Sequence, residues 1–174
     1  GIKKFIPNFK IEYWIIFVLL ISNHRAPDNM KPALFLDRDG VINENYGYVH
    51  QKCDFDFIPG IFELVTCAKS AGYLTIVVTN QAGIGRGYYS EADFEMVTIW
   101  MLDVFESEGV HVEKVYFSPY HPVFGIGKYK KDHFSRKPHP GMLLEAKSQF
   151  DLDFSVVLGD KLENLEEKYK AYEY

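Results

Sequence analysis

A short apolar run that ends in two aspartates constrains the fold of this chain more than any other feature. Residues 33–36 predict a buried strand, and Asp37-Arg38-Asp39-Gly40 follows directly. In an open α/β sheet, ligands bind in the crevice beyond the carboxyl ends of the strands, so both aspartates are expected there. Neighbouring carboxylates repel each other, and a hard divalent cation is the simplest way to keep both ionised.

Strand-like and helix-like segments alternate along the rest of the chain. Continuous apolar or β-branched runs predict further strands at residues 74–78, 112–117 and 154–158. Amphipathic patterns with capping signals predict helices at residues 61–71, 90–108 and 140–150, and a final polar helix at 162–170. This order predicts an α/β fold, a Rossmann-like parallel sheet with helices on both faces.

Three irregular segments interrupt this alternation. Residues 41–58 show no helical period and predict a small flap, a loop or hairpin over the crevice. Residues 83–87 are glycine-rich and predict a flexible turn. Residues 118–138 form a long irregular segment whose length indicates a functional loop. A large cap domain is not expected.

Composition narrows the possible partners. The 174 residues, 47% of them hydrophobic, suit one globular domain, and a monomer is expected. The net charge of −5 provides no basic field for nucleic acid, so no nucleic-acid partner is expected.

The two cysteines, Cys53 and Cys67, lack the spacing of a disulfide framework. A reducing compartment follows, and the expected location is cytoplasmic.

The N-terminal segment differs from the rest. Residues 13–21 form an apolar run that is too short to span a bilayer, so no membrane partner is expected. The run resembles the core of a signal peptide, but no small-x-small cleavage site follows it. We therefore expect residues 1–29 to be an extension, foreign or disordered. Residues 30–174 are expected to form the working domain.

Polar residues that could carry chemistry follow the predicted strands. They are Asp37, Asp39, Thr79, Asn80 and Asp160, with Lys137 in the loop before the last helix–strand unit. Taken singly, such residues at strand ends are more often turn formers or helix caps. Together they suit phosphoryl transfer, which needs a carboxylate nucleophile, an acid that passes a proton, donors for phosphate oxygens, and a cation site.

Four motifs in this order resemble those of the haloacid dehalogenase (HAD) superfamily of phosphatases. They are Asp37-Arg38-Asp39-Gly40, Val78-Thr79-Asn80-Gln81, Arg136-Lys137-Pro138 and Gly159-Asp160-Lys161. Three further runs, at residues 47–50, 80–87 and 136–142, resemble more narrowly the D-glycero-D-manno-heptose 1,7-bisphosphate phosphatases and the related histidinol-phosphate phosphatase domain. The resemblance covers about residues 31–163.

The resemblance implies a role for each catalytic position. Asp37 would attack phosphorus and become an aspartyl phosphate, while Asp39 would protonate the leaving alkoxide and then activate water. Thr79 and Lys137 would hold the phosphoryl oxygens. Mg²⁺ would be held by Asp37, by the backbone carbonyl of Asp39 and by Asp160.

The same resemblance implies a small phosphorylated sugar as substrate, with the C7 phosphate of the heptose bisphosphate, a lipopolysaccharide precursor, as the leading candidate. The residues expected to contact it are Asn45, Tyr46, Gly47, Tyr48, Asn80, Gln81, Ala82, Arg136 and Lys161. Two alternatives stay open: a histidinol-phosphate phosphatase, and a catalytically degenerate HAD-like binding module.

Three departures from the family pattern support the degenerate alternative. Many relatives hold a structural zinc with cysteines and a histidine, where this chain has Ser118, Tyr120, His133 and Ser135, so zinc is not expected. The loop would then be ordered by aromatic packing among Tyr116, Phe117, Tyr120, Phe124 and Tyr129, or be mobile. Asn164 replaces a usual acid near the cation, and the domain is expected to lack a final strand and helix.

Overall fold

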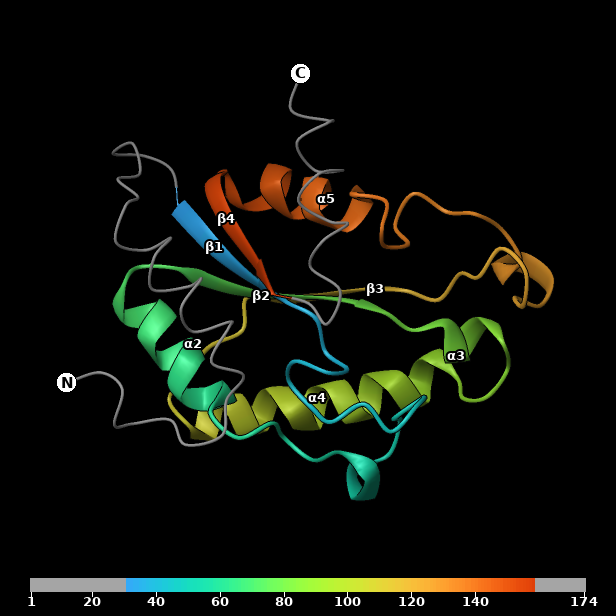
Figure 1. Cartoon of the computed structure of the whole chain (residues 1–174), viewed down its shortest axis with the longest axis horizontal. Helices are drawn as coiled ribbons and strands as arrows, with labels where there is room; N and C mark the ends of the chain where they lie inside the picture. The colour runs from blue at the N-terminus through green and yellow to red at the C-terminus, as the bar shows by residue number, and fades with distance from the viewer. Residues whose placement is uncertain (1–30, 159–174) are drawn as a thin grey trace.

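A four-stranded parallel sheet forms the centre of the molecule in the computed structural model, which describes residues 31–158 (Figure 1). The strands are β1 (Lys31–Leu36), β2 (Leu74–Asn80), β3 (Lys114–Ser118) and β4 (Leu152–Leu158). Their order is β3-β2-β1-β4, and every neighbouring pair is parallel. The predicted parallel α/β sheet is confirmed.

Helices cover both faces of this sheet, as predicted. Leu34 and Leu36 of β1 pack into one core with α2 (Ile61–Ser70) and α4 (Glu91–Ser107). Ala33 and Phe35 face the opposite side and pack into a second core with α5 (Gly141–Phe150). Figure 1 shows α5 on one side of the sheet and α2 and α4 on the other. A central strand buried on both faces explains the unbroken apolar run in the sequence.

The predicted helix ends are confirmed at α2 and α4. The side chain of Ser90 accepts a hydrogen bond from the amide of Asp93, whose carboxylate accepts from the amide of Ser90, and this capping box begins α4. Gly72 and Gly109 follow the two helices with φ of 86° and 78°, values that favour glycine.

The glycine-rich segment after β2 differs from the prediction of a flexible turn. Residues Ala82–Gly85 form a short helix, α3, and its two glycines are buried. A Cβ on Gly83 would lie 2.2 Å from Cε1 of Tyr89, and one on Gly85 would lie 2.2 Å from the carbonyl oxygen of Pro119. These glycines therefore permit close packing and do not supply flexibility.

The flap, residues 41–58, folds back on itself as an irregular hairpin, as predicted. Asn43 pairs with Phe57 in an antiparallel bridge, and the amide of Ile58 donates to the carbonyl of Ile42 at 2.9 Å. The rings of Phe55 and Phe57 lie 5.4 Å and 5.7 Å from the ring of Trp100 on α4. Figure 1 shows the flap running along α4 beyond the end of β1.

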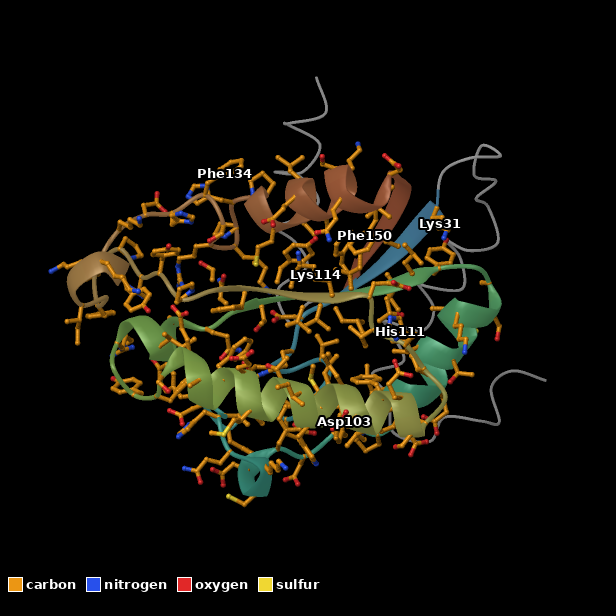
Figure 2. The ribbon with its side chains drawn as sticks, turned by 180° about the vertical axis from the view of Figure 1, so that it is seen from behind. Lys31, Asp103, His111, Lys114, Phe134 and Phe150 are labelled. Atoms are coloured by element: carbon orange, nitrogen blue, oxygen red, sulfur yellow. The ribbon has the colours of Figure 1, made fainter. Side chains whose placement is uncertain are left out.

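The long segment between β3 and α5 is irregular, as predicted. Aromatic contacts help to order it: the Tyr120 ring lies 6.0 Å from that of Tyr129, and His121 lies 5.0 Å from Phe124. Figure 2 shows this segment reaching α5 through Phe134, whose carbonyl accepts a hydrogen bond from the amide of Gly141 at 3.1 Å.

Several predictions concern residues outside the described part of the chain. These are the extension at residues 1–29, the final helix, and the site residues Asp160, Lys161 and Asn164. Within residues 31–158, no helix has the length and apolar character needed to cross a membrane.

Candidate active site

An ion pair between β1 and the loop before α5 marks the centre of the candidate site. Asp37 follows the last residue of β1, and its Oδ2 lies 2.6 Å from Nζ of Lys137. The two side chains are only 16% and 10% exposed, so solvent screens the pair weakly. Lys137 Nζ also donates to the carbonyl of Val78 in β2 at 3.1 Å. The site therefore joins two neighbouring strand ends.

Asn80, the last residue of β2, fixes the backbone of Lys137. Its Nδ2 donates to the carbonyl of Lys137, and its Oδ1 accepts from the amide of Lys137, both at 3.0 Å. Both ends of the Asn80 amide are thereby engaged by the main chain that carries the lysine. This arrangement makes Asn80 a support for Lys137.

The environment of Asp37 acts on its protonation in opposite directions. Burial raises the pKa of Asp37, and the charge of Asp39 adds to that rise. The charge and hydrogen bond of Lys137, together with the amide of Arg38, lower the pKa and so favour the carboxylate. Burial is the largest influence, so the net effect of this environment is to raise the pKa of Asp37, and a further positive charge at the site would lower it.

Asp39 is held by three side chains. Nη2 of Arg38 lies 2.9 Å from its Oδ1, Nδ2 of Asn43 donates to Oδ1 at 3.0 Å, and Nε2 of Gln81 donates to Oδ2 at 3.0 Å. Its carboxylate is thus oriented by residues that follow β1, by the flap and by the residue after β2. No role was predicted for Arg38 or Asn43 from the sequence.

Arg38 connects the flap with Asp39. It is 1% exposed, and its guanidinium lies 5.8 Å from the ring of Phe55 and 5.7 Å from that of Phe94. Nη2 also donates to the carbonyl of Val49 in the flap. In the sequence, only its place inside the Asp-x-Asp motif could have indicated a role for Arg38. The aromatic residues that contact it come from distant segments.

Gln81 contacts both Asp39 and Thr79 through its side-chain amide. Thr79 is buried, and its hydroxyl accepts a hydrogen bond from Nε2 of Gln81 at 2.9 Å. The Oε1 of Gln81 accepts from the hydroxyl of Tyr89 at 2.5 Å. Ala82 follows Gln81 and begins α3. The predicted contact of Thr79 with phosphate stays a prediction.

The four predicted flap residues lie exposed at its tip, at residues 45–48. The hydroxyl of Tyr46 donates to Asp56 at 2.9 Å, and Oδ1 of Asn45 accepts from the amide of Gly47 at 3.2 Å. The hydroxyl of Tyr48 accepts from Nη1 of Arg86 just after α3 at 2.5 Å. These contacts shape the tip while leaving it open to solvent.

The residues at the predicted positions of lost zinc ligands contact one another. Ser135 Oγ donates to Ser118 Oγ at 3.0 Å and lies 2.7 Å from Nδ1 of His133, whose ring stacks 4.0 Å from that of Tyr120. Arg136 is next in the chain, and its Nη1 donates to the carbonyl of Tyr120 at 2.9 Å. Among the described residues, no three His, Cys, Asp or Glu side chains are grouped as a metal site.

Comparison with known proteins gives several close relatives, although no family model matches the chain. The chain is 59% identical over 131 residues to a D-glycero-alpha-D-manno-heptose-1,7-bisphosphate 7-phosphatase of Burkholderia mallei, covering 74% of this chain and 69% of the relative. It is 48% identical over 137 residues to a D-glycero-beta-D-manno-heptose-1,7-bisphosphate 7-phosphatase of Vibrio cholerae, covering 78% and 74%.

Similar solved structures are also phosphatases, as the sequence relatives are. A HAD-like phosphatase from Mesorhizobium loti superposes with a TM-score of 0.75 at 38% identity, over 86% of this chain and 72% of that one. The D,D-heptose 1,7-bisphosphate phosphatase of B. bronchiseptica, complexed with magnesium and phosphate, has a TM-score of 0.67 at 27% identity, over 82% and 76%.

Proposed function

Since the chain belongs to the family of D-glycero-D-manno-heptose-1,7-bisphosphate 7-phosphatases, we propose that it hydrolyses the C7 phosphate ester of that bisphosphate and leaves the 1-phosphate. The observation that carries the proposal is the 2.6 Å ion pair between Asp37 and Lys137 at the carboxyl ends of the strands. It sets a nucleophile beside a cation that can hold the transferring phosphoryl group.

The proposed reaction proceeds in two steps. In the first, a carboxylate oxygen of Asp37 attacks phosphorus while the bond from phosphorus to the C7 oxygen breaks and Asp39 gives that oxygen a proton. In the second, Asp39 takes a proton from water, which attacks the phosphorus of the aspartyl phosphate. Inorganic phosphate leaves, and Asp37 returns to a carboxylate.

The surroundings of the two acids support these roles. Lys137 is fixed by Asn80 and by Val78, so its ammonium is already positioned for phosphoryl oxygens. Three side chains contact the carboxylate of Asp39 and would hold it in place for the two proton transfers that we propose. Thr79 is proposed to donate its hydroxyl to a phosphoryl oxygen.

The donors at the site suit Mg²⁺. The Asp37 carboxylate and the Asp39 carbonyl are hard oxygen ligands, and burial of Asp37 favours a nearby positive charge. We propose that these two groups and Asp160 would hold the ion. When bound, Mg²⁺ would offset the charge that gathers on the phosphoryl oxygens.

The open flap tip is proposed to bind the sugar. Asn45, Tyr46, Gly47 and Tyr48 are exposed there and offer amide and hydroxyl groups to the hydroxyls of a heptose. Arg136 and Lys161 are proposed to bind the second phosphate, a role that suits the forked donors of arginine.

A phosphate-release assay with Mg²⁺ tests the proposal. The panel contains both heptose bisphosphate anomers, fructose 1,6-bisphosphate and histidinol phosphate. We expect the heptose bisphosphates to be preferred, with the α anomer ahead, because the relative at 59% identity is named for that anomer. Preference for histidinol phosphate would overturn the substrate assignment, and no release from any compound would support a degenerate binding module.

A further inference from the structure

A buried tyrosine outside the predicted site ends a hydrogen-bond chain that leads to Asp39. The hydroxyl of Tyr89 donates to Oε1 of Gln81 at 2.5 Å, and the Nε2 of the same amide donates to Asp39 at 3.0 Å and to Thr79 at 2.9 Å. Tyr89 is 7% exposed and Gln81 is 2% exposed, so water cannot easily replace these partners.

The Asp39 carboxylate and the Tyr89 hydroxyl together fix which way the Gln81 amide points. A flipped amide would turn its oxygen toward the Asp39 carboxylate, where two acceptors would repel, and would remove the acceptor to which the Tyr89 hydroxyl donates. Burial raises the pKa of Tyr89 to about 12, so its hydroxyl keeps the proton that it donates. The amide is thereby held with both Nε2 hydrogens facing the site.

The ring of Tyr89 contacts both α3 and the flap. It packs against Gly83 of α3, where a Cβ would lie only 2.2 Å from the ring. The ring of His50 from the flap stacks on it with a centroid distance of 4.7 Å and an interplanar angle of 2°. The position of the hydroxyl therefore depends on both α3 and the flap.

We propose that Tyr89 is a positioning residue for proton transfer by Asp39, acting through the amide of Gln81. The same amide occupies a lone pair of the Thr79 hydroxyl, which leaves the hydroxyl hydrogen for another acceptor. One buried hydroxyl thus orients two groups of the site. The inference rests on the proposed role of Asp39 as the acid and base.

The test compares Tyr89→Phe with Tyr116→Phe. Tyr116 also donates to a glutamine Oε1 at 2.5 Å, that of Gln149, but on the sheet face that α5 covers. We expect Tyr89→Phe to lower kcat/KM for the heptose bisphosphate about tenfold, and to lower that for 4-nitrophenyl phosphate much less, because kcat/KM reports the first phosphoryl transfer and 4-nitrophenolate leaves without a proton from Asp39. Tyr116→Phe should leave both activities within about twofold of wild type.

A double variant tests whether Tyr89 acts through Gln81. In a Gln81→Met background, Tyr89→Phe should cause no additional loss of kcat/KM. An equal loss on both substrates, an additive loss in the double variant, or a Tyr89→Phe rate equal to that of Tyr116→Phe would each overturn the proposal.

A measurement without substrate separates this inference from the proposed function. Hydrogen exchange of the Gln81 side-chain NH₂, followed by ¹⁵N NMR, should be slow in the wild-type protein and about tenfold faster in Tyr89→Phe. Unchanged exchange would overturn the proposal. If the wild-type protein released no phosphate but exchange were still faster in Tyr89→Phe, the proposed function would be disproved. The contact by which Tyr89 positions the Gln81 amide would still be supported.

Discussion

Lys137 contacts Asp37 at the carboxyl ends of the strands, with Nζ 2.6 Å from Oδ2. Asp37 follows β1, whereas Lys137 lies in the loop before α5. Neither side chain is free to move far, because Arg38 donates its amide to Asp37 at 2.8 Å and Asn80 holds the backbone of Lys137. The pair is therefore a fixed element of the site.

Replacing the lysine should remove most of the activity. We expect Lys137→Met to lower kcat about 10²–10³-fold, because the variant loses a fixed positive charge beside the phosphoryl group. Lys130→Met is the matched control, since Lys130 is an exposed lysine of the same loop. Steady-state phosphate release measures both, and equal activity of the two variants would contradict the role of Lys137.

The two hydrogen bonds from Asn80 to the backbone of Lys137 should contribute to both the stability of the protein and its rate of phosphate release. Asn80→Ala leaves the amide and carbonyl of Lys137 without their side-chain partners, so we expect a loss of about 1–2 kcal/mol in the free energy of unfolding. We also expect kcat to fall while KM changes less. Denaturant unfolding and steady-state kinetics check this, and a variant with native stability and rate would show that these two hydrogen bonds are dispensable.

Local patterns in the sequence predicted the sheet and most of its helices. The unbroken apolar runs marked parallel strands, and Ser90 with Asp93 marked the start of α4, because these signals depend only on neighbouring residues. The positions of Asp37, Thr79 and Lys137 near the carboxyl ends of the strands followed from the topology.

Contacts between distant segments could not be predicted in this way. Arg38 contacts the rings of Phe55 and Phe94. Tyr89 contacts His50 and Gly83, and no period in the sequence joins any of these residues. The glycines of α3 indicated flexibility because a glycine needed for close packing has the same sequence signal as one needed for a turn.

The close approach at α3 predicts a steric cost. We expect Gly83→Ala to lower the free energy of unfolding by about 1–3 kcal/mol, because the added methyl group would meet the ring of Tyr89 at 2.2 Å. Thermal unfolding measures the change. A variant as stable as the wild type would mean that the ring can shift without loss of packing.

The capping box predicts a pH-dependent contribution to stability. Hydrogen bonds from the amide and hydroxyl of Ser90 lower the pKa of Asp93 from its usual value of 3.8. A folded-state pKa below the unfolded value stabilises the protein above that unfolded value, and this stabilisation is lost as the pH falls through the folded pKa. Asp93→Asn should therefore be less stable than wild type at pH 7, with a smaller difference below about pH 4.

A matched variant on the same helix controls for the change in charge. Asp103 is exposed on the side of α4 away from the sheet (Figure 2), so Asp103→Asn should show no comparable difference. Urea unfolding at several pH values measures both variants. A difference for Asp93→Asn that does not depend on pH would contradict the role of its carboxylate.

Phosphate release by Asp37→Asn tests the central claim most directly. The substitution keeps the shape of the side chain but removes the nucleophilic carboxylate, so we predict no Mg²⁺-dependent release from heptose 1,7-bisphosphate above the uncatalysed background. The substitution also leaves the ammonium of Lys137 without its carboxylate partner, so thermal unfolding of the same variant must show that it is folded at the assay temperature. Full activity in this folded variant would contradict the assignment of Asp37 as the nucleophile.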